Sequence, residues 1–451
     1  MKTILLYSLF VTLTMMGCAE FLELKPDQKM AVPNTLNHAD LLLSDYSTMN
    51  TGYPSLGQVA CDEYYLNTED WNALPEEDEK AAYTWSDQIM MMHTQWQNAY
   101  KTVYVANQVL EILDNVARNM EPVRYGHVLG GAHFFRAFAL HQLAGVYTLP
   151  YQSSTADQEL GIPLRLSPAL DYKSVRSTLQ ATYDQIIADY KDAIKQLPIT
   201  EPRSGRPHKA AAYAGLARVY LDMQDYEKAY RYADSCLMFK SDLLNYQELD
   251  AESPLPIARF NKEVLFAATM VFTNALGPYY ARITPELFTS YEDSDLRKKL
   301  FFEENESDAG TYAFKGSYDN TTGAPFVGLT SSEVYLIRAE SAVRTGKSAM
   351  ALADINKLLE HRIVHTDFAP VSETDPKRLL SIIINERRKE LVFRGLRWGD
   401  LRRLNQEESF RKTLNRTIDG KIYTLEPNTP KYALLIPDLV ITESGMPQNK
   451  R

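Results

Sequence analysis

Apolar residues recur at three- and four-residue intervals through most of the chain, which is the pattern of helices that bury one face. The spacing is unbroken over residues 175–197 and predicts one long helix there. A helical hairpin follows, with Ala217 and Ala229 twelve positions apart on its two arms, and Ala339 and Ala351 repeat that spacing. Small residues at such positions let two helices approach closely, so the pattern predicts helix pairs.

The predicted pairs form two blocks separated by long insertions. They have the layout of divergent tetratricopeptide repeats and are expected over about residues 94–240 and 331–404. Stretches rich in proline and glycine predict loop-dominated insertions at about residues 51–90 and 250–330, which we call the first and the second excursion. Excursions this long in a compact fold are usually functional. The expected architecture is mainly α, with few or short strands, in one domain over residues 18–451.

The start of the chain has the pattern of a secretory signal. Lys2 precedes an apolar stretch over residues 4–16, and Gly17 and Cys18 close it. This stretch is too short to span a bilayer, which needs about 20 apolar residues. A small residue followed by cysteine ends bacterial lipoprotein signals, so we expect residues 1–17 to be removed and Cys18 to be acylated. The alternative is an ordinary signal with a cysteine nearby.

Composition narrows the possible partners. The chain has 48 Lys and Arg against 58 Asp and Glu, a net charge of −10. This balance argues against nucleic acid, which is bound by basic stripes. Of the three cysteines, Cys61 and Cys236 remain once Cys18 is acylated, and we expect them to be buried and free rather than part of a disulfide framework.

Charged residues interrupt the apolar stripes of the C-terminal third. Arg387 follows helical spacing with Leu380, Ile384 and Leu391, so it falls within an apolar stripe. A buried charge without a partner would cost on the order of several kcal/mol, so such residues must be paired. We expect one buried ion network. Its members are Glu340, Glu386, Arg387, Arg397 and Asp400. Glu386 and Glu390, four apart, could instead form an acid/base pair, but their arginine neighbours favour ion pairing.

Short motifs stand in a fixed order along nearly the whole mature chain. They lie at residues 18–24, 96–110, 136–138, 147–150, 161–164, 295–297, 333–340, 385–391, 395–404, 436–437 and 448–449. In order and spacing they resemble the SusD/RagB family of Gram-negative outer-membrane nutrient-uptake lipoproteins. Many members carry Glu where this chain has Arg394, so the ion network is expected to differ at that corner.

The resemblance implies a lipoprotein of the outer membrane, exposed at the cell surface. It implies a SusC-like TonB-dependent transporter as partner, which the protein covers as a lid, and an oligosaccharide or another nutrient as ligand. Members of the family are not enzymes, so no catalytic residue and no cofactor are expected. Their repeats support the fold and the transporter contact, while inserted loops carry the ligand. Both excursions are therefore expected to meet in space, on the side away from the repeats.

The residues themselves suggest where a ligand would bind. Flat aromatic faces bury the apolar C–H faces of sugars, while carboxylates and amides bind the hydroxyls. The candidates are Asp62, Tyr64, Tyr65, Trp71, Tyr83 and Trp85 in the first excursion and Tyr279, Tyr280 and Tyr318 in the second. The alternative for each ring is that it packs a loop onto the helices, because Tyr and Trp are common amphipathic packing groups.

Two other functions compete with nutrient binding. A scaffold lipoprotein that contacts only proteins through its repeats would bind no small ligand. A glycosidase would need two carboxylates about 5–10 Å apart across a cleft, and the sequence shows no acid motif of that kind. His361 and His365 stand four apart, but no Glu follows His361 as zinc hydrolases require, so no metal site is expected.

Overall fold

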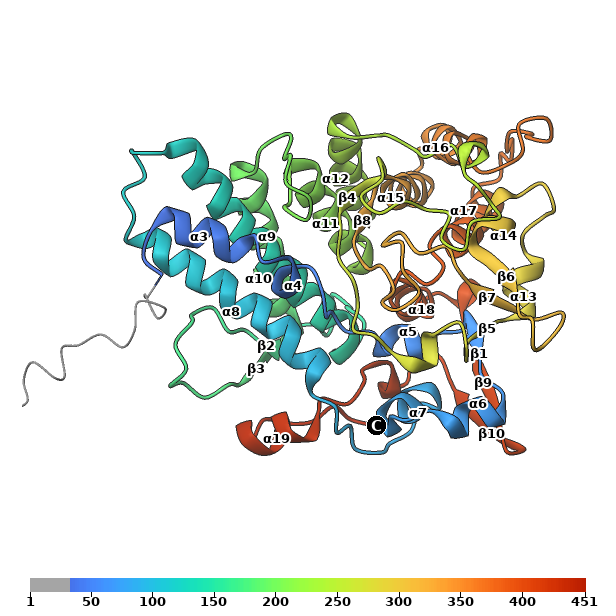
Figure 1. Ribbon diagram of the computed structural model, residues 1–451, viewed down its shortest axis with the longest axis horizontal. Coiled ribbons are helices and arrows are strands. Elements are labelled where there is room, and N and C mark those ends of the chain that lie inside the picture. The colour runs from blue at the N-terminus through green and yellow to red at the C-terminus, as the bar shows by residue number, and fades with distance from the viewer. Residues whose placement is uncertain (1–32) are drawn as a thin grey trace, which may run out of the picture.

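The computed structural model describes residues 33–451, and helices dominate it (Figure 1). The predicted signal peptide and Cys18 lie outside the described residues. The helices of the repeat blocks are α8 (Thr94–Asp114), α9 (Pro122–Tyr147), α10 (Leu179–Gln196), α11 (Lys209–Asp222), α12 (Tyr226–Phe239), α15 (Ser331–Arg344), α16 (Ser348–Glu360), α17 (Pro376–Glu390) and α18 (Arg397–Leu404). The prediction of a mainly α fold built from helix pairs is confirmed.

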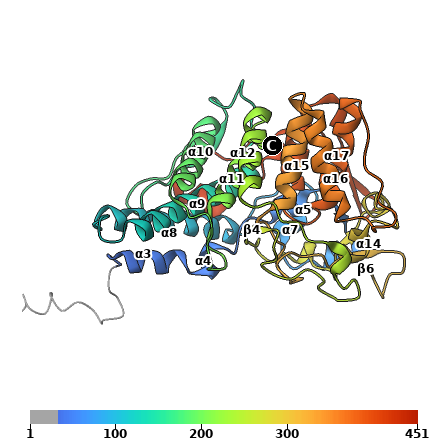
Figure 2. The same cartoon turned by 90° about the horizontal axis from the view of Figure 1, so that it is seen from above.

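The two repeat blocks form one continuous row of helices. From α8 to α12 each helix packs on the next, and α12 packs on α15 although the second excursion separates them in sequence. Figure 2 shows this row along one side of the molecule. The four alanines that predict close approach of the helices are all fully buried. They are Ala217 on α11, Ala229 on α12, Ala339 on α15 and Ala351 on α16.

One predicted helix begins later than its apolar spacing suggests. Over residues 175–197 only α10, which starts at Leu179, is helical. Residues 176–178 form β3 (Arg176–Thr178), which pairs antiparallel with β2 (Leu160–Pro163). The Thr178 side chain accepts a hydrogen bond from the Ala181 amide, and this N-cap fixes the start of the helix.

The excursions consist of short helices and two-stranded antiparallel sheets rather than of loops alone. The short helices of the chain are α3 (Leu36–Leu43), α4 (Tyr46–Met49), α5 (Leu56–Ala60), α6 (Thr68–Ala73), α7 (Glu77–Tyr83), α13 (Pro285–Thr289), α14 (Leu296–Phe301) and α19 (Asp438–Ser444), with 3-10 turns η2 (Tyr246–Glu248), η3 (Asn274–Leu276), η4 (Glu408–Phe410) and η5 (Pro430–Tyr432). The remaining strands are β1 (Tyr64–Tyr65), β4 (Val264–Phe266), β5 (Arg282–Ile283), β6 (Phe302–Glu304), β7 (Tyr312–Phe314), β8 (Leu329–Thr330), β9 (Leu414–Ile418) and β10 (Lys421–Leu425). They pair as β1 with β5, β4 with β8, β6 with β7 and β9 with β10.

The two excursions meet in space, as expected, and several contacts hold them together, among them a strand pair and a carboxylate that accepts from two amides. Strand β1 of the first pairs with β5 of the second. The Glu79 carboxylate on α7 also accepts hydrogen bonds from the Asn274 and Ala275 amides of η3, at 3.1 and 2.8 Å. In Figure 2, α5, α7, α14 and β6 lie on the side opposite the row α10–α12 and α15–α17.

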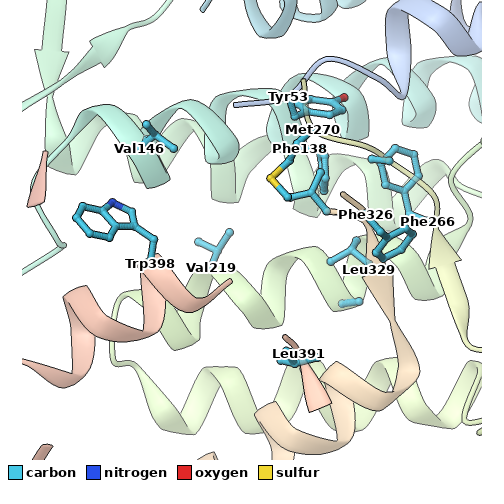
Figure 3. Close-up of a cluster of buried hydrophobic side chains, with 14 of the residues drawn as sticks. Tyr53, Phe138, Val146, Val219, Phe266, Met270, Phe326, Leu329, Leu391 and Trp398 are labelled. Carbon is cyan, nitrogen blue, oxygen red and sulfur yellow. The ribbon is translucent and has the colours of Figure 1, made fainter. Parts of the chain in front are cut away.

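The core joins the helix row to the excursions. Phe138 of α9 is fully buried, and its ring meets those of Tyr53 and Phe266 edge to face at 4.9 Å each (Figure 3). Trp398 of α18 stacks on Tyr432 at 4.9 Å. Because aromatic pairs prefer such geometries, the contacts of Phe138 with Tyr53 and Phe266 fix how the excursions sit on α9.

Cys61 and Cys236 are buried with free thiols, as predicted. Over residues 33–451 no helix combines the length and the hydropathy that crossing a membrane requires. The same part of the chain contains no group of three or more His, Cys, Asp or Glu side chains placed to hold a metal ion.

Candidate ligand-binding site

The five residues of the predicted ion network are all buried and paired, but they divide among three clusters. In the first, Arg403 of α18 reaches Glu340 of α15 at 2.8 Å and Asp400 at 2.8 Å, and Arg387 of α17 lies 2.9 Å from Asp400. Burial raises the pKa of both carboxyl groups, but the arginines outweigh it and hold each pKa below its usual value. This cluster ties three repeat helices together.

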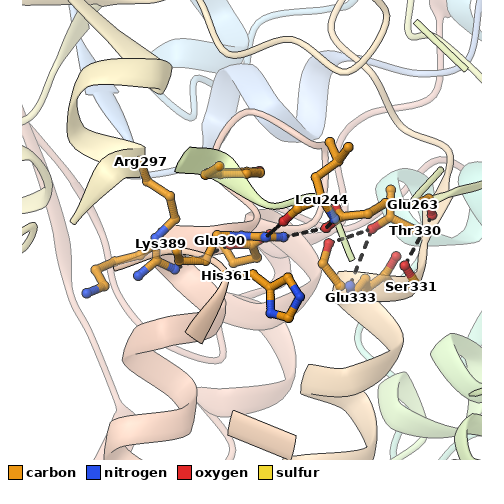
Figure 4. Close-up of polar contacts among 12 residues, drawn as sticks. Leu244, Glu263, Arg297, Thr330, Ser331, Glu333, His361, Lys389 and Glu390 are labelled. Carbon is orange, nitrogen blue, oxygen red and sulfur yellow. Dashed lines mark hydrogen bonds and ion pairs between the residues drawn. The ribbon is translucent and has the colours of Figure 1, made fainter. Parts of the chain in front are cut away.

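The second cluster joins α17 to the second excursion. Arg297 lies 2.6 Å from Glu386 and 3.3 Å from Glu390, and Arg362 bridges Glu390 and Glu263 at 2.9 and 2.7 Å (Figure 4). The side chains of Arg297, Arg362, Glu263 and Glu390 are completely buried. Such groups are stable only while every partner is present. Glu386 therefore serves the fold, as expected for ion pairing rather than acid/base chemistry.

Tyr318 belongs to the same buried region, so its assignment as a ligand ring is wrong. It is 1% exposed, and its hydroxyl donates to Glu263 at 2.6 Å. The Arg394 guanidinium covers its ring at 3.6 Å. Arg394 thus makes a cation–π contact at the corner where we expect the ion network to differ.

The third cluster binds Asp62, one of the predicted ligand residues. Arg397 lies 2.6 Å from this carboxylate, Lys412 2.9 Å and Arg388 3.4 Å. Burial raises the pKa of Asp62, but these cations outweigh it and hold the pKa well below its usual value. Arg397 therefore forms its ion pair with Asp62 of the first excursion rather than with Asp400. This ion pair fixes the first excursion on α18.

A pocket of about 440 Å³ lies beside this cluster, and we call it the excursion pocket. Five of the nine predicted ligand residues line it: Asp62, Tyr64, Tyr65, Tyr83 and Trp85. Residues of α13 and of the segment 412–417 close the other sides, including Glu286, Lys412 and Asn415. The sequence did not indicate residues 412–417, because they follow the last repeat motif and contain no aromatic residue.

Three of these rings form the inner wall of the pocket and are not free to stack on a ligand. Tyr64, Tyr83 and Trp85 are 2%, 1% and 1% exposed. They surround the Arg416 guanidinium, which lies 3.6 Å from the Tyr83 ring and 4.8 Å from the Trp85 ring. The Trp85 indole also donates to the Ala60 carbonyl at 2.9 Å. The expectation that these rings offer open faces is therefore wrong, because a buried cation occupies them.

The open part of the candidate site is organised by Arg282. This residue stands opposite Tyr65 in the β1–β5 ladder, so the two side chains share one face of the strands. Its guanidinium pairs with Asp70 of α6 and with Asp308 at 2.7 Å, and it donates to the Tyr280 carbonyl at 3.1 Å. One side chain thus connects α6, the segment between β6 and β7 and the segment that precedes β5.

Four predicted aromatic residues stand next to the contacts of this arginine along the chain or in strand register, and we call them the Arg282 surface: Tyr65 opposite it on β1, Trp71 after Asp70 on α6, and Tyr279 and Tyr280 before β5. Tyr279 is 82% exposed, and its ring meets that of Tyr280 at 5.0 Å. Trp71 follows Asp70 on α6 and is half-buried, with the Lys80 ammonium 5.7 Å from its ring. Rings fixed at a surface in this way can stack on the apolar face of a ligand.

The arrangement is that of a helical-repeat protein whose inserted segments carry an aromatic and polar pocket. Residues 20–221 match the SusD-like family described as starch-binding and associating with the outer membrane, and residues 305–433 match the SusD family. The chain belongs to the SusD/RagB family.

Individual relatives are distant in sequence and similar in fold. SusD-like protein P2 of Formosa agariphila is 24% identical over 382 residues, which cover 71% of this chain and 73% of that protein. A putative sugar binding protein from Bacteroides vulgatus superposes with a TM-score of 0.75 at 21% identity, over 93% of this chain and 99% of the other. Surface glycan-binding protein A from Bacteroides uniformis superposes with a TM-score of 0.70 at 16% identity, over 92% of this chain and 99% of the other. At these identities the two solved structures show a shared fold.

Proposed function

We propose that the protein binds an oligosaccharide at the Arg282 surface and the excursion pocket, without transforming it. The observation that carries this proposal is the pairing of β1 with β5, which brings aromatic residues of both excursions around one arginine. Membership of a family described as starch-binding supports the ligand class, as do fold relatives named for sugar or glycan binding.

The chemistry of the site suits sugars. Tyr279 and Trp71 offer ring surface for C–H faces, and the exposed Asn415, Thr417 and Glu286 of the pocket can bind hydroxyls. Stacking at an open site gives modest affinity, so we expect dissociation constants near micromolar or weaker, corresponding to about −8 kcal/mol or less favourable.

The carboxylates around the pocket support binding rather than catalysis. Asp62 and Glu286, the two that line it among the described residues, are both paired with Arg388 and Lys412. Glu63 has the raised pKa of a general acid, about 7, because it is buried. It is 1% exposed, however, and its carboxylate accepts from the Gln58 side-chain amide at 2.6 Å and from the Phe393 backbone amide at 2.9 Å, and neither residue lines the pocket. No pair of free carboxylates therefore flanks a ligand, as glycoside hydrolysis would require.

We further propose that one domain, residues 18–451, is anchored to the outer membrane by an acylated Cys18, faces the cell exterior and delivers its ligand to a SusC-like TonB-dependent transporter. The family description, which includes association with the outer membrane, supports this location. Changing Cys18 to Ala should move the protein from the membrane fraction to the soluble fraction. Unchanged retention in membranes would contradict the anchor.

Titration calorimetry of the purified protein against soluble oligosaccharides, followed by analysis of the recovered sugars, tests the binding function. We expect saturable binding and unaltered ligand. A protein that binds no saccharide of the panel would instead fit a scaffold that contacts only proteins.

A further inference from the structure

A second aromatic pocket lies on the first repeat block, and none of its lining residues belongs to either excursion. Its volume is about 440 Å³, within the range of roughly 300–1,000 Å³ found for small-ligand sites. Helix α8, the loop that follows β2 and helix α19 form its walls. We call it the helix-face pocket.

One wall is a row of rings on α8. Trp96, Tyr100 and Tyr104 follow each other at intervals of four residues, so they lie on the same face of the helix. The Trp96 and Tyr100 rings are 4.9 Å apart, and the Tyr100 hydroxyl donates to the Pro163 carbonyl at 2.8 Å. Tyr100 and Tyr104 are both half-buried. The protein itself therefore fixes this wall while part of its ring surface stays open.

The opposite wall is the loop after β2, and Arg165 holds it in place. The guanidinium stacks on the Tyr172 ring at 3.8 Å. It also donates to the Ser174 hydroxyl at 2.9 Å and to the Ala169 carbonyl at 2.7 Å. Tyr172 is 37% exposed and lines the pocket, so a fixed ring lies on this side as well.

Two charged side chains complete the lining. Lys173 on the loop and Glu443 on α19 both line the pocket, and neither forms an ion pair or a hydrogen bond with any residue of 33–451. With Arg165, whose guanidinium is bound to its own loop, the lining has two cations against one carboxylate, a net charge of +1. Lys173 and Glu443 supply a donor and an acceptor beside the ring faces.

We propose that the helix-face pocket binds a second saccharide segment, an inference that rests on the proposed function. Ring faces on two walls suit the C–H faces of sugars, and Lys173 and Glu443 suit their hydroxyls. An acyl chain would use the rings alone and would make no use of the donor and the acceptor that these two exposed side chains offer. Two separated saccharide sites on one protein strengthen the capture of a long polysaccharide through avidity.

The test uses the full-length protein and two pairs of substitutions. The first pair, Trp71→Ala with Tyr279→Ala, removes ring surface from the excursions. The second pair, Tyr104→Ala with Tyr172→Ala, removes it from the helix-face pocket. Tyr230→Ala on α12, a half-buried tyrosine that lines neither pocket, is the matched control. Calorimetry measures binding of size-matched soluble oligosaccharides, with maltoheptaose among them, and thermal melting confirms that each variant folds.

We expect the excursion variant to bind saccharide more weakly than the wild type but still measurably. Adding the second pair of substitutions to it should lower the remaining affinity by at least about a further tenfold. Adding Tyr230→Ala instead should leave that remaining affinity unchanged. Residual binding that the second pair does not alter, or no residual binding at all, would overturn the second site while the proposed function stands. In that case the neighbouring Leu170, which is 79% exposed, would favour a protein partner at this face. A wild-type protein that binds no saccharide would overturn the proposed function itself.

Discussion

Tyr65 and Arg282 stand opposite each other in a two-residue antiparallel ladder, although 217 positions of sequence lie between them. This pairing joins the two excursions at the point where their aromatic residues gather. Arg282 then extends the connection through its ion pairs with Asp70 and Asp308. The proposed ligand surface is thus built on one strand pair and one guanidinium.

Changing Arg282 to Ala should weaken saccharide binding by about tenfold or more and lower the free energy of unfolding by about 1–3 kcal/mol. The reason is that Asp70 loses its partner while its side chain is only 14% exposed. Lys195→Ala on α10 is the control, because its ion pair with Asp192 is exposed on both sides, at 66% and 44%, and exposed pairs contribute about 0–1 kcal/mol. Calorimetry and urea unfolding measure the two effects. Equal effects of both substitutions would contradict the organising role of Arg282.

Arg403 should matter more for stability than Arg387, although both are buried. Arg403→Ala leaves Glu340 and Asp400 each with one partner fewer, and we expect a loss on the order of 3–5 kcal/mol. Arg387→Ala should cost less, because Asp400 keeps Arg403 and Glu340 keeps both Arg403 and Arg344. Urea unfolding of both variants gives the comparison. A larger loss from Arg387→Ala would show that the cluster is held together differently.

Glu63 should make stability depend on pH between about 4.5 and 7. Burial raises its pKa in the folded protein to about 7, against 4.5 for the ordinary group. Its contribution is therefore fully present below pH 4.5 and is lost as pH rises through 7, a loss on the order of 3 kcal/mol. Glu63→Gln should remove this dependence, so the variant should be more stable than the wild type at pH 8 and should gain little over it at pH 5.

Unfolding measured at pH 5 and pH 8 provides the check, with Glu69→Gln, an exposed site on α6, as control. If the stability of the Glu63→Gln variant changes with pH as that of the wild type does, the pKa of Glu63 is not raised in the folded protein.

The local sequence pattern was sufficient to predict the repeat helices. It did not predict which side chains are buried where residues distant in the sequence cover them. The helices expected over 94–240 are present because their apolar spacing matches the faces that pack. The stripe around Arg387 likewise showed that this charge is buried. Nothing near Trp85 in sequence indicates that Arg416, 331 positions later, fills the space beside its ring.

The ion network shows the same limit. Sequence spacing placed Arg397 and Asp400 together, since they lie one turn apart on a helix. The structure instead pairs Arg397 with Asp62, which lies 335 positions earlier. Partner choice among buried charges depends on tertiary packing, so their burial could be predicted and their grouping could not.

The most direct test of ligand capture without turnover is calorimetry of the wild type and of a Trp71→Ala and Tyr279→Ala double variant, followed by analysis of the recovered sugars. We expect binding near micromolar or weaker for at least one class of oligosaccharide, with every sugar recovered intact. The double variant should bind at least about tenfold more weakly and melt at a temperature close to that of the wild type. Cleaved sugar, or affinity unchanged by the loss of both rings, would contradict the proposed function.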